Sequence, residues 1–350
     1  MTDPASITSN QDGGPVALYR LAPERAARRL LSRQLKQAEA AGQRLAAGED
    51  PEALHDFRVA LRRFRSLERA HRTWLGDAMP KKLRKRLKLL VHSTGPARDS
   101  EVQLEWLDAQ RAALRPNQRP GHHWLRCRLE ERQRRGYTEV RSCLASEFIG
   151  LSLALRRALA VPAQTSPMSF ARVSGEQLKP LLKELRGEFA AVSGEDGVQH
   201  IHAARLLVKR ARYLLEPVAA AFDGGEALVR ELGRLQDQLG SIHDAEVLGQ
   251  SLVEAAEAAG AMRYHSLVTR ALGHDLEEFG PVARRRGDER AGLTALAQRV
   301  QAEFQQTRAR LHADIRAGRV EDLLLRVDAA VEALAPADEP AESAAQHAFE

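Results

Sequence analysis

The sequence has very few cysteines and no long apolar run. Cys127 and Cys143 lie sixteen residues apart and are the only cysteines among 350 residues, which excludes a disulfide framework and a C-x-x-C zinc site. No segment approaches the roughly 18 uncharged apolar residues that a membrane-spanning helix needs. Residues 1–10 also lack the basic-then-apolar order of a signal peptide. We therefore expect a soluble, cytoplasmic protein with no cofactor, no metal site and no membrane contact.

Residues that favour strands are also scarce. Aromatic side chains make up 5% of the chain, β-branched residues rarely cluster, and alanine, leucine, arginine, glutamate and glutamine dominate every long segment. An apolar content of 43% together with 29% charged residues is sufficient for a buried core in a chain of this length. The sequence therefore predicts an all-α fold.

Proline, glycine and serine divide the chain into two helical halves. The stretch VPAQTSPMSFARVSGE, at residues 161–176, is the clearest linker, and both ends of the chain have the composition of disordered tails. The predicted organisation comprises an N-terminal tail (1–17), a first helical bundle (18–160), a linker (161–173), a second helical bundle (174–334) and an acidic C-terminal tail (335–350).

Two motifs of the first half recur in the second half. Residues 55–65 (HDFRVALRRFR) match residues 202–212 (HAARLLVKRAR) at an offset of 147, and residues 95–102 (GPARDSEV) match residues 240–247 (GSIHDAEV) at an offset of 145. The histidine and the basic positions of the longer motif are kept, whereas its apolar positions differ. A repeat of this kind indicates two copies of one helical unit. We therefore predict an internal duplication, with one helical unit in each half of the chain.

The longer motif places a row of cations beside the apolar face of its helix. At about 100° per residue, the histidine and three of the basic residues of each motif lie within an arc of about 80° around the helix. The whole chain carries a formal net charge of +6. Few acidic residues flank this row, and like charges three or four residues apart destabilise a free helix. The pattern therefore favours a bound polyanion over a solvated helix face. The two rows consist of His55, Arg58, Arg62 and Arg65 and of His202, Arg205, Lys209 and Arg212.

A second basic segment precedes the Gly-Pro break of the first half. It carries Lys81, Lys85, Lys88 and His92 within an arc of about 60°. The corresponding helix of the second half offers Arg234 but also acidic neighbours. We expect these residues to extend the polyanion-binding surface, mainly in the first half. The alternative is that they form a lysine-rich helix face that only contacts water.

These motifs resemble those of the CHAD family, the conserved histidine α-helical domain. The resemblance rests on His-x-x-Arg-x-x-x-[Arg/Lys]-[Arg/Lys]-x-Arg in each half, followed by a basic-Asp pair, and it spans residues 18–334. It implies tandem helical bundles related by a pseudo-twofold axis, with a basic surface that binds inorganic polyphosphate without catalysis and can target the protein to polyphosphate granules. The family's binding positions fall on His55, Arg58, Arg62, Arg63, Arg65, His202, Arg205, Lys209, Arg210 and Arg212, and its second motif on Arg98, Asp99, His243 and Asp244.

Polyphosphate has no bases, so its recognition depends on cation spacing and counterion release. Positions three or four apart on a helix lie about 4.5 to 6 Å apart along the axis, which suits neighbouring phosphates. His55 and His202 are expected to donate to phosphate oxygens and to take up protons when the anion binds. The aspartates of the second motif either orient their basic neighbours or cap the following helix. Helical angle alone turns Arg63 and Arg210 towards solvent.

Nucleic acid is the main alternative partner, because it also presents a chain of phosphates. The cation rows contain no Asn or Gln for reading base edges and no aromatic side chains for stacking on bases, so we expect nucleic-acid binding to be weak. A metal-dependent phosphohydrolase is disfavoured, because the His-Asp pairs are not preserved between the repeats. The sequence leaves open the oligomeric state and the preferred length of polyphosphate.

Overall fold

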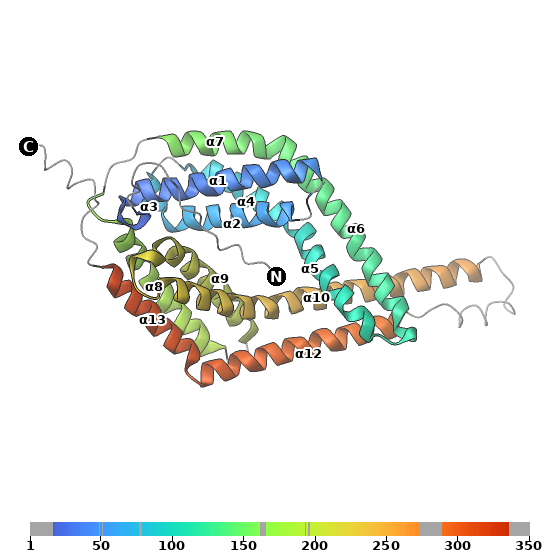
Figure 1. Ribbon diagram of the computed structural model, residues 1–350. Coiled ribbons are helices and arrows are strands. Elements are labelled where there is room, and N and C mark those ends of the chain that lie inside the picture. The colour runs from blue at the N-terminus through green and yellow to red at the C-terminus, as the bar shows by residue number, and fades with distance from the viewer. Residues whose placement is uncertain are drawn as a thin grey trace, which may run out of the picture.

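The computed structural model describes residues 17–48, 50, 52–76, 79–161, 166–192, 194, 197–272 and 289–335. Every regular element within these ranges is helical, which confirms the predicted all-α class (Figure 1). None of these helices has a stretch both long and apolar enough to cross a lipid bilayer. The helices are α1 (Pro23–Ala47), α2 (Ala53–Ala70), α3 (Arg72–Leu75), α4 (Lys81–Ser93), α5 (Gly95–Gln110), α6 (Arg119–Cys143), α7 (Ile149–Ala160), α8 (Phe170–Ala191), α9 (Gly197–Leu215), α10 (Gly225–Ala271), α12 (Glu289–Arg316) and α13 (Arg319–Leu334).

The apolar faces predicted for the two motif helices are buried. In α2, Leu54, Phe57, Leu61 and Phe64 are all buried, and the matching face of α9 is buried in the same way. The basic residues follow the border of this face. Their stems can therefore pack at the edge of the core while their charged heads stay near solvent.

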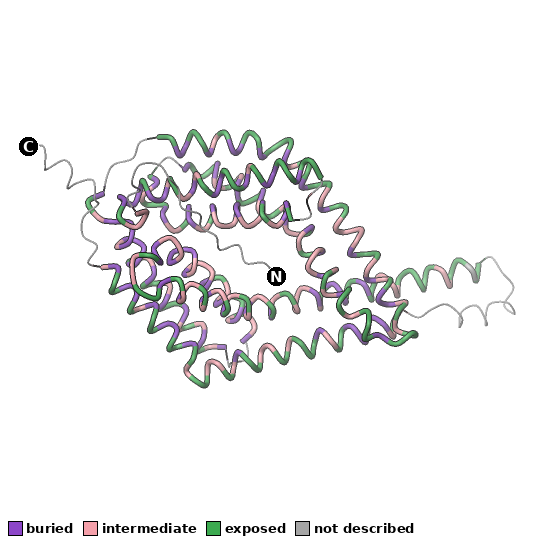
Figure 2. Tube along the Cα trace, in the orientation of Figure 1, coloured by how far each residue is buried: buried purple, intermediate pink, exposed green. Residues whose placement is uncertain are grey.

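Buried apolar side chains of the described residues form three clusters. The first lies among α1, α2, α4 and α7 and includes Phe57. The second lies among α8, α9, α10 and α13 and includes Val208. The third combines the two halves, because it joins Leu107 of α5 and Leu125 of α6 to Leu296 of α12. The purple segments of α5, α6, α10 and α12 in Figure 2 follow this third cluster. The halves are therefore joined by a core of their own.

Helices α6 and α12 cross at a pair of glycines beside this third cluster. The Cα atom of Gly292 lies 2.7 Å from the position that a β-carbon would take on Gly121, and a β-carbon on Gly292 would lie 2.1 Å from the carbonyl oxygen of Gln118. These distances are far shorter than van der Waals contact, so only glycine allows the two backbones to approach so closely. A similar approach occurs where Gly136 of α6 meets Ala97 of α5. Direct backbone packing therefore holds α12 on the first half.

Two boundaries differ from those predicted for the linker and the bundles. Helix α8 begins at Phe170, which is fully buried, so residues 170–173 form its first turn and are not part of a linker. Leu21 and Ala26 belong to the first half in sequence but pack in the second cluster. The predicted tails lie almost entirely outside the described residues. The pseudo-twofold relation between the halves stays a prediction.

The glycine crossing predicts that Gly292→Ala destabilises the protein by roughly 2 kcal/mol or more, because the added methyl group forces α6 and α12 apart. Gly249 of α10 is the matched control, since nothing lies within 4 Å of its β-carbon position. Gly249→Ala should leave stability unchanged or raise it by up to about 1 kcal/mol through helix propensity. Urea unfolding followed by circular dichroism measures both changes, and equal stabilities of the two variants would contradict the close crossing.

His71 is a fully buried histidine at the junction of the two halves. It follows the last residue of α2, and its ring packs 4.8 Å from the ring of Phe170 at the start of α8. Neither ring nitrogen has a hydrogen-bond partner among the described residues. Burial lowers the pKa of His71 from 6.5 to about 4. The folded protein therefore holds this ring neutral at pH values where the unfolded chain protonates it.

This shift predicts that stability is lost as the pH falls from about 6.5 towards about 4, because the unfolded chain then binds the additional proton. Between about pH 7 and about pH 4.5, the wild-type protein should lose about 2 kcal/mol more unfolding free energy than His71→Leu does. Chemical denaturation at a series of pH values tests this, with His265→Gln as the control at an exposed histidine. Parallel pH profiles for the wild type and His71→Leu would refute the prediction.

Candidate functional site

The cationic rows of the two repeated motifs meet in space. They lie on α2 and α9, which pack against each other (Figure 1). The charge of Arg62 on α2 acts on both Arg205 and Lys209 of α9, and the charge of Arg58 also reaches Lys209. Cations from the two halves of the sequence therefore share one site.

Helices α5 and α10 bring the second motif to the same place. The carboxylate of Asp99 on α5 interacts with Arg58 and Arg205. The carboxylate of Asp244 on α10 interacts with Arg205 and Arg98, and the two carboxylates repel each other. We define the cation cluster as the basic residues Arg58, Arg62, Arg98, Arg205 and Lys209 together with the carboxylates Asp99 and Asp244.

Burial and like charge act together on the cation cluster. The pKa of Lys209 is lowered to about 7, first by burial and then by the charges of Arg62 and Arg205. Burial also lowers the pKa of Arg58 and that of Arg205, although a carboxylate of the cluster opposes each shift. Burial in turn raises the pKa of both carboxylates. The site thus concentrates positive charge that a bound anion would stabilise.

Several guanidinium groups at the site have donors without a partner. The buried Nε atoms of Arg58, Arg62 and Arg212 make no hydrogen bond within the described part of the chain. Arg58 donates through Nη1 to the hydroxyl of Thr94 at 2.8 Å, and this hydroxyl donates to the carbonyl oxygen of Val91 at 2.8 Å. One edge of the Arg58 guanidinium is therefore fixed by the protein. Donors left without a partner are costly, so these buried Nε atoms lower the stability of the free site.

The motif histidines lie beside the cation cluster. His55 is half-buried, and burial followed by the charge of Arg98 lowers its pKa below 6.5. His202 packs against His243 with ring centroids 5.1 Å apart, and burial lowers the pKa of His243 to about 4. His55 and His243 are therefore mostly neutral at pH 7 in the free protein. They would gain charge only when an anion binds nearby.

Comparison with known proteins agrees with the motifs. A family model described as CHAD domain matches residues 29–253, which is more than half of the chain. The chain belongs to the CHAD domain family. The motif resemblance is thereby confirmed, and α12 and α13 lie beyond the matched segment. No curated protein is significantly similar to the chain.

Two solved structures share the CHAD fold of this chain. The crystal structure of the CHAD domain from the plant Ricinus communis has a TM-score of 0.55 and 26% sequence identity, and the match covers 79% of this chain and 92% of that chain. PptA from Streptomyces chartreusis has a TM-score of 0.62 and 17% identity, and the match covers 84% of this chain and 99% of that chain. The second likeness supports the fold alone.

Two basic residues of the CHAD motif helices lie to the side of the cation cluster. Arg63 forms an ion pair with Glu216 of the second half at 3.4 Å, and its guanidinium lies over the ring of Tyr213. It therefore bridges the halves and does not face open solvent, as its helical angle had suggested. Arg212 lies over the same ring, 5.2 Å from the centroid, and its charge reaches Lys209. The ring of Tyr213 thus contacts both Arg63, which bridges the two halves, and Arg212, which borders the cation cluster.

The remaining predicted residues lie apart from these interactions. Arg210 is half-buried and interacts electrostatically with Arg69 and Glu184. The four predicted residues of α4 are exposed, and none of the interactions described above reaches them. The exposed predicted residues are Lys81, Lys85, Lys88 and His92 on α4, Arg65 on α2 and Arg234 on α10.

Sequence reasoning missed three residues that support the cation cluster. Thr94 is fully buried and fixes the Arg58 guanidinium. Glu101 accepts a hydrogen bond from Nη1 of Arg98 at 2.8 Å, and Arg132 of α6 acts electrostatically on one of the carboxylates. The i, i+3 spacing of Arg98 and Glu101 was a usable signal. Nothing in the sequence indicates the contact of Thr94, because it depends on how α2 packs against the start of α5.

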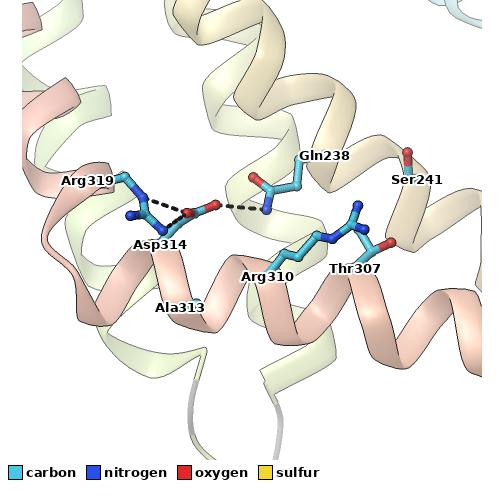
Figure 3. Close-up of a pocket in the computed structure, with 7 residues that line it drawn as sticks. All are labelled: Gln238, Ser241, Thr307, Arg310, Ala313, Asp314 and Arg319. Atoms are coloured by element: carbon cyan, nitrogen blue, oxygen red, sulfur yellow. Dashed lines mark hydrogen bonds and ion pairs between the residues drawn. The ribbon is translucent and has the colours of Figure 1, made fainter.

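Two cavities border α10 where it faces α12. The larger, of about 450 Å³, contains Asp314, whose carboxylate accepts hydrogen bonds from Nε2 of Gln238 at 3.1 Å and from Nε of Arg319 at 2.7 Å (Figure 3). The smaller, of about 240 Å³, shares Ser241 with the first and extends to Asp244 of the cation cluster. In the larger cavity Asp314 is thus paired with Arg319, whereas the smaller cavity contains two acidic residues and no basic one.

Proposed function

We propose that this CHAD protein binds inorganic polyphosphate through the cation cluster and catalyses no reaction on it. The observation that carries the proposal is the convergence of basic residues from both halves on one site between α2 and α9. Membership of the CHAD family supports the same ligand, since this family is linked to polyphosphate binding. A polyanion suits such a site because it neutralises several cations at once and releases its own counterions.

A phosphate chain that passes between α2 and α9 replaces repulsion with attraction. It can accept charge-assisted hydrogen bonds from the guanidinium groups of the cation cluster, such as that of Arg62. A long chain binds better than a short one, because further phosphates can reach cations outside the cluster, including the exposed row on α4. The groove so formed would be lined by both halves. We further propose that this binding directs the protein to polyphosphate granules in the cytoplasm.

The proposal predicts that Arg58→Gln combined with Arg205→Gln lowers the affinity for long-chain polyphosphate by about 100-fold, because one charge-assisted contact is lost from each half. The dependence of affinity on salt should also become less steep. The matched control is Arg134→Gln with Arg135→Gln, which removes two exposed arginines of α6 that pair with Glu131. Fluorescence anisotropy measures affinity, and circular dichroism verifies folding. Equal loss of affinity in both double variants would contradict a defined site.

The same titration separates polyphosphate from nucleic acid. Long-chain polyphosphate is set in competition against single-stranded RNA, duplex DNA and triphosphate at about 150 mM salt. Polyphosphate should win, because the cluster offers no aromatic side chain on which bases can stack. RNA or DNA that competes equally well would favour the nucleic-acid alternative.

Binding is also predicted to take up protons near neutral pH. Lys209 has a pKa of about 7 in the free protein, and a bound polyanion raises this pKa. Affinity should therefore increase as the pH falls from about 8.5 to about 7, and Lys209→Arg should flatten this dependence because arginine stays charged. Calorimetry in buffers of different ionisation enthalpy measures the proton uptake. The same uptake in the wild type and in Lys209→Arg would show that another group titrates.

A further inference from the structure

The smaller cavity, between α5, α10 and α12, differs in character from the cation cluster beside it. Its apolar walls include Trp106, Leu248 and Val300, and no basic side chain is among the residues that line it. Its charged groups are the carboxylates of Asp244 and Glu303. The cavity is therefore both apolar and negatively charged, which is the complement of an organic cation.

Gln103 supplies an unused hydrogen-bond acceptor at this cavity. The residue lines the cavity and is only 4% exposed, and its Oε1 atom has no hydrogen-bond partner among the described residues. Leaving a buried amide oxygen without a donor is costly. A ligand reaches this oxygen only when the Gln103 amide turns towards the cavity, and an N–H donor placed there would then remove that cost.

Neither carboxylate of the cavity has a direct cationic partner in the described part of the chain. The two oxygens of Glu303 accept from neutral donors, namely Nε1 of Trp106 at 2.7 Å and Nε2 of Gln110 at 3.4 Å. Asp244 interacts with Arg205 and Arg98 only through longer-range electrostatics. In the larger cavity, by contrast, the carboxylate of Asp314 is already paired with Arg319 (Figure 3). The smaller cavity differs from the larger one because its two carboxylates, both on exposed residues, make no ion pair with a described residue.

We propose that the smaller cavity binds a primary alkylammonium cation, with its ammonium group directed to Gln103, Asp244 and Glu303 and its alkyl chain against Trp106 and Leu248. An ammonium group carries three donors and a positive charge, so it can serve an amide oxygen and carboxylates together. Bonds from a charged donor are stronger than those between neutral groups. A metal ion is a poorer match, because the described residues contain no group of three ligands placed to hold one and because a metal ion leaves the apolar walls unused.

The test uses the full chain without polyphosphate and n-pentylamine as the probe. Calorimetry should show saturable binding of n-pentylamine, with 1-pentanol and pentanoate at least about tenfold weaker at the same ionic strength. Gln103→Met and Glu303→Gln should each weaken n-pentylamine binding by about tenfold. Asp237→Asn is the matched control, since Asp237 is an exposed acid of α10 outside the cavity lining, and its affinity should equal that of the wild type.

Three results would overturn the proposed alkylammonium site. In the first, 1-pentanol binds as tightly as n-pentylamine. In the second, Gln103→Met and Glu303→Gln bind n-pentylamine as tightly as the wild type, and in the third, the folded wild-type protein shows no saturable binding. Equal loss in Asp237→Asn would likewise show that general surface charge, and not the cavity, attracts the amine.

The shared carboxylate also predicts coupling between the two sites, and this part of the inference rests on the proposed function. Because Asp244 belongs to both the cavity and the cation cluster, a bound ammonium offsets a negative charge that polyphosphate would otherwise meet. Saturating n-pentylamine should tighten polyphosphate binding about fivefold in the wild type and not in Gln103→Met. Any direct binding of amine to polyphosphate is the same for both proteins.

The outcomes separate the two proposals. Equal polyphosphate affinity with and without n-pentylamine in the wild type would overturn the coupling but not the amine site. Failure of polyphosphate to bind at all would overturn the proposed function, whereas n-pentylamine binding to the polyphosphate-free protein is measured independently of it.

Discussion

Repulsion among half-buried cations is the constraint on which the rest of this structure depends. Five basic residues from both halves converge at the cation cluster, and three carboxylates offset part of their charge, namely Asp99, Asp244 and Glu101, which is paired with Arg98. Bringing like charges together costs free energy, and the cost is larger where water is partly excluded. The free protein relieves part of this cost at Lys209, whose pKa falls to about 7. Under the proposed function, a bound polyanion would offset this repulsion, so the repulsion that destabilises the free site would become affinity for the ligand.

The scaffold has to hold these charges together against their repulsion. The third apolar cluster joins α5 and α6 to α10 and α12, and the glycine crossing brings the backbones of α6 and α12 into direct contact. On the opposite side of the site, Arg63 bridges to Glu216. Because α12 lies beyond the segment matched by the CHAD family model, the chain uses elements outside that segment to keep its halves in place.

Sequence periodicity predicted what each helix presents, but not which helices meet. The buried faces of α2 and α9 and the cation rows beside them follow from spacing alone, because side chains three or four apart share one face. Membership of the CHAD family followed from the same residues. The third apolar cluster, the support of Arg58 by Thr94 and the bridge made by Arg63 depend on contacts between distant segments, on which helical angle carries no information. The smaller cavity was missed for the same reason, since its three walls come from three helices.

The most direct test of the central claim is an experimental structure of the protein with long-chain polyphosphate bound. The phosphate chain should run between α2 and α9 and contact basic residues of both halves, with Arg58 and Arg62 on one side and Arg205 and Lys209 on the other. A phosphate chain bound only to the exposed lysines of α4, with the cluster between α2 and α9 unoccupied, would contradict it.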